Sequence, residues 1–346
     1  MVVLGVDLHK RSHTVVVIDE TGHKLAEKTV AATDDGHLEL RRWAAARWPG
    51  RTWGLEDCRH LSRRLEADLV RAGERVIRVP PKLTAGARRS AREPGKSDPI
   101  DALAVGRAVL REPDLPVASL DGPEREVRLL IDHREDLVGE RTRHEQRLRW
   151  FLVELAIAEP APRSLGRAVV QATLSAALAG RTEPVARFAR DLLARIVELT
   201  TAIRGLDREI DALIGALAPT LLALPGCGPL SAAKIVGETA GISRFRSKEA
   251  FARHNGSAPI PVWSGNLVRH RLNRGGNRQL NAALHRIAIT QMRIDDRGRG
   301  YLDHRRAAGD TKTEAIRALR RRISDEVFRR LHADEAARSR ALMAAA

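Results

Sequence analysis

The sequence predicts an α/β domain at the N-terminus, followed by a mainly helical chain. Within the first 30 residues, three segments of strand length follow one another, at 1–8, 14–18 and 24–30, and short polar turns separate them. From about residue 124 onward, leucine and isoleucine instead recur every three or four positions, as in amphipathic helices. Between the two patterns, residues 113–123 contain three prolines and one glycine, which is typical of a linker.

The predicted N-terminal domain covers residues 1–112 and contains two further strands and three helices. The strands are expected at 52–56 and 76–79, and the helices at 38–48, 61–72 and 98–110. Three successive strands followed by alternating helices and strands match a ribonuclease-H-like fold. Such a fold carries acidic residues on the central strands of a mixed sheet.

Four acidic residues stand at the ends of these elements: Asp7, Glu56, Asp98 and Asp101. Asp7 interrupts an apolar strand, where a carboxylate is unfavourable unless it is paired or bound to a metal ion. Asp98 and Asp101 are three residues apart on a helix, so both point the same way, although acids at a helix start also serve as plain capping residues. Because oxygen ligands suit Mg²⁺ or Mn²⁺, we expect the four acids to converge on one or two such ions, an arrangement that suits phosphoryl transfer.

A basic segment lies between the last strand and Asp98. Residues 80–97 have proline and glycine near both ends, which predicts a loop. Its cationic residues are Lys82, Arg88, Arg89, Arg92 and Lys96. The segment is either a solvated loop or, because it precedes the acids, a loop that grips phosphate groups.

The middle of the chain, residues 113–217, is predicted to be a linker and a coiled coil. Leu130, Leu137, His144 and Phe151 recur every seven residues, and Leu148, Leu152 and Leu155 fill the same side. A second series steps by threes and fours: Phe188, Leu192, Ile196, Leu199, Ile203, Leu206, Ile210, Leu213 and Leu217. Such a seam over about four heptads argues for a coiled coil, which we interpret as an oligomerisation arm.

The third region, residues 218–346, begins with an apolar stretch, Gly226-Cys227-Gly228 and a helix. This pattern predicts a helix-hairpin-helix, in which Gly226 and Gly228 let backbone N–H groups approach a phosphate. Cys227 has no neighbouring basic residue to lower its pKa, and we interpret it as a small filler.

A second basic segment, residues 251–278, combines glycine, proline and asparagine with Arg269, Arg271, Arg274 and Arg278, which predicts a loop-rich basic patch. Within it, Ser264 precedes a glycine, a pair that most often forms a turn. Helices are expected at 280–292 and 313–331, and the alanine-rich residues that follow look like a frayed tail.

Composition limits the class of protein. The 346 residues carry 60 lysines and arginines against 44 aspartates and glutamates, a formal net charge of +16. This excess favours a nucleic-acid partner. The two cysteines, Cys58 and Cys227, suit a reducing compartment. There is neither a basic n-region at the start nor an apolar run of membrane-spanning length, so we expect a cytoplasmic protein without a membrane partner.

Together, several motifs resemble one known family. GVDLHK, GLED, KSDPIDA, LPGCGPLSA, SAPIPVWSG and RGGNRQLN follow one another in the order found in the insertion-sequence-110 transposases, the DEDD-type enzymes described as bridge-RNA-guided recombinases. The resemblance covers nearly the whole chain. KSDPIDA and the combination of the SG pair with GNRQLN are its specific parts.

The resemblance implies a ribonuclease-H-like domain similar to Holliday-junction resolvases, joined through a coiled coil to a C-terminal transposase domain. The four acids of the family fall on Asp7, Glu56, Asp98 and Asp101, which would bind Mg²⁺. The family's serine, thought to attack DNA and form a covalent phosphoserine, falls on Ser264. The resemblance further implies a composite active site from different protomers of a dimer or tetramer. It also implies a structured RNA that pairs with the element ends and the target DNA.

Several alternatives stay open at this point. Ser257 offers a second hydroxyl seven residues before Ser264, and Asp57 is a rival for Glu56. A metal-dependent, structure-specific endonuclease would use only the acids and would hydrolyse DNA with water. A scaffold that binds nucleic acid through a degenerate site would have no activity. The target and guide sequences would be set by pairing with the RNA and not by the residues of this chain, and the residues leave open whether this chain is active.

Overall fold

The computed structural model of the chain describes residues 2–57, 61–89, 97–112, 115–118, 122–157, 164–264, 267–271, 273 and 275–345, except the side chains of residues 87–89, 264, 267–269 and 345. The chain divides into two compact units, residues 1–121 and 122–346. The division into residues 1–112, 113–217 and 218–346 stays a prediction.

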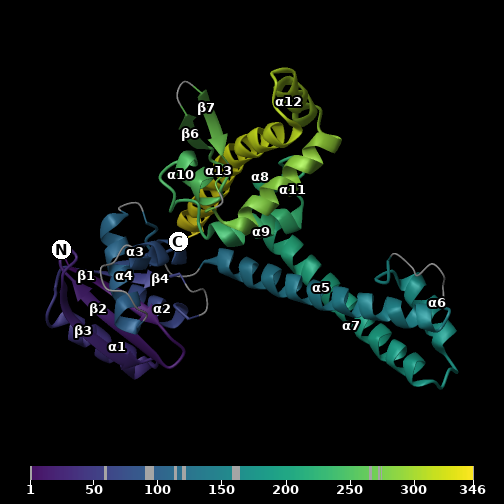
Figure 1. The fold of residues 1–346 in the computed structure, drawn as a ribbon, viewed down its shortest axis with the longest axis horizontal. Coiled ribbons are helices and arrows are strands. Elements are labelled where there is room, and N and C mark those ends of the chain that lie inside the picture. The colour runs from purple at the N-terminus through teal and green to yellow at the C-terminus, as the bar shows by residue number, and fades with distance from the viewer. Residues whose placement is uncertain are drawn as a thin grey trace. The chain divides into compact units, whose positions relative to one another are not determined.

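A five-stranded mixed sheet forms the centre of the first unit (Figure 1). Its strands are β1 (Val2–Leu8), β2 (Ser12–Ile18), β3 (Lys24–Ala31), β4 (Arg51–Glu56) and β5 (Val76–Val79). They are ordered β3-β2-β1-β4-β5. Strand β2 runs antiparallel to both neighbours, whereas β1, β4 and β5 are parallel. The predicted mixed α/β domain is therefore confirmed, with the two acid-bearing strands adjacent at its centre.

Helices cover both faces of this sheet. They are α1 (Asp34–Ala45), α2 (Arg63–Arg71), α3 (Pro81–Arg89) and α4 (Asp98–Arg111). Leu40 of α1 and Leu65 of α2 join a core with Leu4 and Val6, whereas Ala102 of α4 packs with Val3 on the opposite face. The expectation of a loop across residues 80–97 is wrong for its first half. There, Pro81 starts a helix that is stabilised by burial of Thr84 and packing of Leu83 against α4.

Helix α4 lies unusually close to β1, because glycines face each other at the contact. A Cβ atom on Gly5 would lie 2.1 Å from the carbonyl oxygen of Ala102 and 2.5 Å from the amide nitrogen of Gly106. A Cβ atom on Gly106 would lie 2.9 Å from the side chain of Ile18. The helix backbone thus rests directly on the strand backbone, and this contact fixes the height of α4 above the sheet.

Two long helices, α5 (Pro123–Glu154) and α7 (Pro184–Leu217), lie side by side in the second unit, and α6 (Ala168–Leu178) packs at their far end (Figure 1). Five of the nine residues predicted for the seam of α7 are buried, three are half-buried, and Phe188 is 46% exposed. On α5, Leu148 and Leu152 are buried as predicted, whereas Leu137 and His144 are only half-buried and Ile131 is buried instead. The strict seven-residue spacing misses the face that packs, since the α-helix repeats every 3.6 residues.

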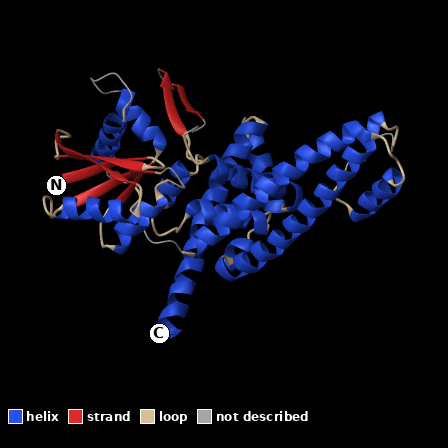
Figure 2. Cartoon of the chain, turned by 90° about the horizontal axis from the view of Figure 1, so that it is seen from below, coloured by secondary structure: helices blue, strands red, loops and turns tan. Residues whose placement is uncertain are grey.

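The remaining elements form a helical body from which one hairpin of strands projects (Figure 2). They are α8 (Pro219–Leu222), α9 (Pro229–Thr239), α10 (Lys248–His254), β6 (Ile260–Ser264), β7 (Leu267–Arg271), α11 (Arg278–Ile294), α12 (Asp296–Ala307) and α13 (Lys312–Ala345). In the described parts of the chain, no helix has the length and apolar character to cross a membrane.

The expected frayed tail after Leu331 is wrong, because α13 continues to Ala345. The buried carboxylate of Asp334 accepts hydrogen bonds from the backbone N–H groups of Thr220 and Leu221, at 3.0 and 3.3 Å. Arg338 donates to Glu124 at 2.8 Å. These long-range polar contacts order residues whose composition alone suggests fraying.

Two histidines are buried together on the face of the sheet opposite α4. The rings of His13 and His37 are stacked with centroids 5.3 Å apart, and both side chains are only 2% exposed. Burial and the nearby His37 lower the pKa of His13 from 6.5 to about 4. His13 is therefore a neutral part of the core at physiological pH.

The glycine contact gives a first prediction. Replacing Gly5→Ala should destabilise the first unit by about 3 kcal/mol or more, because the added methyl group meets backbone atoms that cannot move independently. The control is Gly50→Ala, where no atom lies within 4 Å of the new methyl group. Urea unfolding followed by tryptophan fluorescence measures both. Equal stability of the two variants would contradict this account of the packing.

The buried histidine gives a second prediction. Between pH 6.5 and 4 the unfolded chain binds a proton at His13 that the folded chain does not, so the free energy of unfolding should fall as the pH falls through this window. The full loss is about 3 kcal/mol at about 1.4 kcal/mol per pH unit. His13→Gln should abolish this part of the loss in urea titrations at pH 7 and 4.5, whereas His23→Gln, at an 83% exposed side chain, should not.

Candidate active site

Two of the four predicted acids are held by adjacent parallel strands. Val6 of β1 is paired with Leu55 of β4, so Asp7 and Glu56 are the next residues along the two strands. Side chains alternate along a strand, and Gly5 and Gly54 both face α4. Asp7 and Glu56 therefore stand on the α4 face, two residues beyond these glycines.

The first turn of α4 supplies the other two acids, Asp98 and Asp101. The carboxylate of Asp98 lies beside that of Asp7, and His9 sits between them. Nε2 of His9 is 2.9 Å from Oδ2 of Asp7 and 3.3 Å from Oδ1 of Asp98. Ligand atoms of these three residues lie within 4.8 Å of one another, a grouping that could hold a metal ion.

Electrostatics link Asp101 to the same place. Burial raises the pKa of Asp7, His9 lowers it, and the charges of Asp101 and Asp98 raise it further. Asp101 is therefore close enough to act on Asp7, although it does not belong to the compact three-residue group. An ionised Asp7 is unfavourable in this setting, and a bound cation would stabilise it.

The side chain of Glu56 is held by a residue of α3. Its carboxylate accepts a hydrogen bond from the hydroxyl of Thr84 on α3, and that hydroxyl also lies 2.8 Å from the carbonyl of Pro81. The rival Asp57 acts on another part of the unit. Burial lowers the pKa of Arg78, but the hydrogen bonds that Arg78 donates to Glu66, together with the charges of Glu66 and Asp57, raise it overall. The structure thus brings Asp7 and Asp98 together and leaves Glu56 outside the compact group of described residues.

His9 was not identified in the sequence analysis, because a histidine in a turn after a strand gives no periodic signal.

A second group was missed as well: Asp34, His37 and Asp68 also bring their ligand atoms within 4.8 Å of one another. There, Nδ1 of His37 lies 2.6 Å from Asp68, while Arg64 pairs with Asp34. Because arginines already pair with these acids, the group is better suited to holding α1 against α2 than to binding a cation.

Ser264 ends strand β6 of a hairpin rather than lying in a loop, and its backbone is paired with that of Leu267. The expected loop is wrong because Ile260–Ser264 and Leu267–Arg271 alternate well enough to pair. Trp263, beside Ser264, is 71% exposed. The hydroxyl oxygen of the rival Ser257, in contrast, is buried without a hydrogen-bond partner among the described residues.

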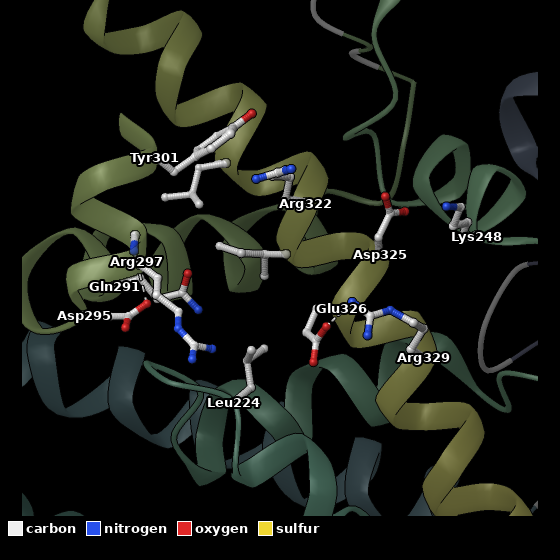
Figure 3. Close-up of a pocket in the computed structure, with 13 residues that line it drawn as sticks. Leu224, Lys248, Gln291, Asp295, Arg297, Tyr301, Arg322, Asp325, Glu326 and Arg329 are labelled. Atoms are coloured by element: carbon white, nitrogen blue, oxygen red, sulfur yellow. Dashed lines mark hydrogen bonds and ion pairs between the residues drawn. The ribbon is translucent and has the colours of Figure 1, made fainter. Parts of the chain in front are cut away.

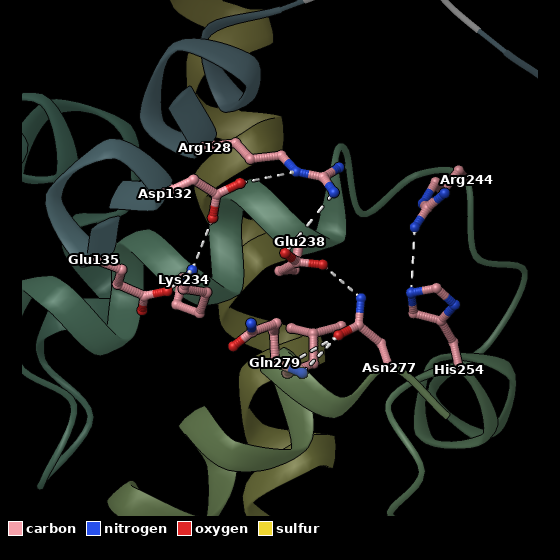
Figure 4. A network of polar contacts seen from close by, with 10 residues as sticks. Arg128, Asp132, Glu135, Lys234, Glu238, Arg244, His254, Asn277 and Gln279 are labelled. Carbon is pink, nitrogen blue, oxygen red and sulfur yellow. Dashed lines mark hydrogen bonds and ion pairs between the residues drawn. The ribbon is translucent and has the colours of Figure 1, made fainter. Parts of the chain in front are cut away.

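A polar network holds the base of this hairpin (Figure 4). The amide nitrogen of Asn277 donates to the carbonyl of His254 at 2.7 Å, and its side chain donates to Glu238 at 2.6 Å. Arg128 of α5 lies 3.8 Å from the same buried Glu238. One turn away, the fully buried Lys234 contacts Asp132 and Glu135 of α5, at 2.9 and 2.8 Å. These residues were not singled out in the sequence analysis. The signal that could have found them is the pair of charged residues, Lys234 and Glu238, inside the otherwise apolar segment KIVGE.

The predicted basic residues are only partly described. Lys82 is exposed at the start of α3, and Arg271 and Arg278 are exposed on either side of the loop after β7. The backbones of Arg88 and Arg89 belong to α3 and that of Arg269 to β7, but their side chains, like that of Ser264, are not described. Arg92, Lys96 and Arg274 lie outside the described residues. Whether these residues bind nucleic acid stays a prediction.

The two glycines before α9 have different surroundings. Gly226 has a φ of +80°, and a Cβ atom there would lie 3.1 Å from both the carbonyl of Ile287 and Cβ of Thr290. Packing against α11 thus accounts for this glycine, whereas a Cβ atom on the exposed Gly228 would meet nothing within 4 Å. Burial raises the pKa of the Cys227 thiol to about 12, as expected for a filler, and Cys58 lies outside the described residues.

A pocket of about 440 Å³ opens among α11, α12 and α13 (Figure 3). It is lined by both signs of charge, including Arg297 and Asp295, and Arg322 stacks 4.5 Å from the centre of the Tyr301 ring. None of the predicted site residues lines it. Its opposite charges neutralise each other, so it does not stand out as a site for a charged substrate.

Models of transposase families match segments of both units. One family model, described as "Transposase", matches residues 4–157, and another, "Transposase IS116/IS110/IS902 family", matches residues 218–303. The uncharacterized 42 kDa protein of insertion element IS900 from Mycobacterium paratuberculosis is 29% identical, over 92% of each chain. The uncharacterized 44.8 kDa protein of IS116 from Streptomyces clavuligerus is 28% identical, over 94% of this chain and 93% of its own.

Among solved structures, Thermus thermophilus RuvC in complex with a Holliday junction substrate is similar to 31% of this chain and 91% of its own, at 17% identity and a TM-score of 0.25. That likeness is too weak to support an argument. The family assignment follows instead from the two domain matches and the nearly full-length relatives. The chain belongs to the IS116/IS110/IS902 family of transposases, enzymes that cut DNA.

Proposed function

We propose that this transposase is an RNA-guided recombinase, which cuts and rejoins the DNA strands of an insertion sequence through a covalent serine intermediate. The observation that carries the proposal is the convergence of Asp7 and Asp98 at the end of β1, where Asp101 also acts on Asp7. Carboxylates that converge from a strand and a helix, with the Asp7 side chain partly buried, suit a metal-dependent phosphoryl-transfer site.

The donor set fits a divalent cation. Asp7 and Asp98 would hold it from two elements, with Asp101 and Glu56 completing the acidic surroundings, and Mg²⁺ or Mn²⁺ suits these oxygen donors. When bound, such an ion offsets the charge of the phosphate and favours attack on it. The side chains themselves orient the site: Thr84 fixes Glu56, and the first turn of α4 fixes Asp98.

Ser264 is the proposed nucleophile. Its oxygen forms a bond to phosphorus while the bond from phosphorus to the leaving strand breaks, and the serine proton passes to solvent as the leaving oxygen gains one. The covalent link keeps the phosphodiester energy, so that a second strand can be joined without ATP. Arg269, Arg271 or Arg274 would neutralise the charge of the transition state. The burial of the Ser257 hydroxyl favours Ser264 over this rival.

The partners follow from charge and from exposed surfaces. A net charge of +16 supports binding of DNA ends, target DNA and a structured guide RNA, which would act in the cytoplasm. The α5–α7 pair is proposed to be a coiled-coil arm that joins protomers as a dimer or tetramer. Trp150 and Phe188 at its far end are 75% and 46% exposed, which supports a contact there. The segment around α8 and α9 is proposed as the helix-hairpin-helix, with Gly228 nearest to a phosphate.

One observation favours a second candidate function. Asp7, His9 and Asp98, which form the cluster, all belong to the first unit. Such a site could activate water by itself. The alternative is therefore a metal-dependent, structure-specific endonuclease in which the serine takes no part.

Asp98→Asn tests for metal-dependent catalysis. It should lower strand cleavage by at least about 10²-fold, because the amide is a weaker ligand for a divalent cation. DNA binding should remain in gel-shift assays. Asp35→Asn is the matched control, since Asp35 is an exposed acid in the first turn of α1. Undiminished cleavage by Asp98→Asn would remove the acids from the mechanism.

Ser264→Ala separates the two candidate functions. In the recombinase it should abolish the covalent protein–DNA adduct on denaturing gels and lower strand exchange by at least about 10³-fold. Ser257→Ala should retain both. If the Ser264 variant still cleaves at the wild-type rate and no adduct is trapped with the wild type, water is the nucleophile and the endonuclease alternative holds.

A further inference from the structure

His9 lies beside the acidic site and is not one of the four predicted acids. It follows β1 directly, and its backbone N–H donates to the carbonyl of Ser12 at 3.0 Å, which fixes the turn into β2. Its half-exposed ring points to the acids, with Nε2 at 2.9 Å from Asp7 and 3.3 Å from Asp98. The two carboxylates come from different elements, and this one nitrogen meets both.

Hydrogen bonding accounts for only part of this arrangement. The Nε2 atom of a neutral imidazole offers either one N–H or one lone pair, so it cannot donate to two carboxylates at full strength. A cation between the three groups satisfies them all: each carboxylate contributes an oxygen and the imidazole contributes its lone pair.

The distances fit such a cation. Ligands that lie about 2.1 Å from an octahedral ion are about 3.0 Å apart when they are neighbours. The nitrogen-to-oxygen distances of 2.9 and 3.3 Å are close to this spacing, and the three ligand atoms all lie within 4.8 Å of one another. The His9 nitrogen thus stands at the spacing expected of a neighbouring ligand from both carboxylates.

We propose that His9 is a direct nitrogen ligand of the divalent cation held by Asp7 and Asp98. The inference rests on the proposed metal-dependent function and adds a residue and a metal preference to it. Mg²⁺ strongly favours oxygen ligands, whereas imidazole suits transition metals. A mixed site of two carboxylates and one imidazole therefore favours Mn²⁺ over Mg²⁺.

Pulsed electron paramagnetic resonance of Mn²⁺ bound to the full-length protein tests the assignment directly. The wild type should show modulation from a coordinated ¹⁴N nucleus, and protein grown with ¹⁵N-histidine should replace it with ¹⁵N modulation. This measurement needs no variant, so a folding defect cannot obscure it. Bound Mn²⁺ without nitrogen modulation would overturn the assignment of His9 and leave the proposed function intact.

Variants identify which histidine is involved. His9→Gln should remove the nitrogen modulation and weaken Mn²⁺ binding at least about tenfold more than Mg²⁺ binding in calorimetry. His23→Gln, at a highly exposed histidine in the turn before β3, should change neither. Persistence of the modulation in the His9 variant would assign the nitrogen elsewhere. If neither ion binds the wild type and Asp98→Asn behaves identically, the proposed metal-dependent function fails as well.

Discussion

The direct contact between the backbones of β1 and α4 is the constraint on which the candidate site depends. Gly5 and Gly106 leave no side chain between strand and helix, so α4 lies low over the centre of the sheet. Asp7 is two residues beyond Gly5, and Asp98 is in the first turn of the same helix. A helix held farther from the sheet would leave these two carboxylates too far apart to share a cation.

Much of this arrangement was predictable from local patterns. The apolar strands predicted the sheet, and Asp7 and Glu56 stood out because each interrupts or ends a buried strand. The contribution of His9 was not predictable, because it depends on a turn that directs the His9 ring toward the start of α4, 89 residues later in the sequence. Helix α3 and the end of α13 were missed for a related reason, since contacts made by Thr84 and Asp334 with distant segments stabilise them.

The two units contribute different parts of the proposed chemistry. The first places acids on a rigid sheet, whereas the second presents a two-stranded hairpin on a helical body. A lone hairpin is only marginally stable in water. The tight contact of Gly256 with Gly276 and the bonds of Asn277 therefore matter, because they fix both ends of the hairpin to α9 and α10.

The buried Lys234 also has a mechanical consequence. Its two carboxylate partners both belong to α5, and a Cβ atom on Gly237 would lie 2.9 Å from Arg128 of the same helix. The arm can therefore neither roll nor slide on α9 without separating the buried Lys234 ammonium from its carboxylate partners. Arg128 of α5 and Asn277 at the base of the hairpin meet at the same buried carboxylate, that of Glu238. A change in the seating of α5 on α9 would therefore disturb a group that also anchors the hairpin with Ser264.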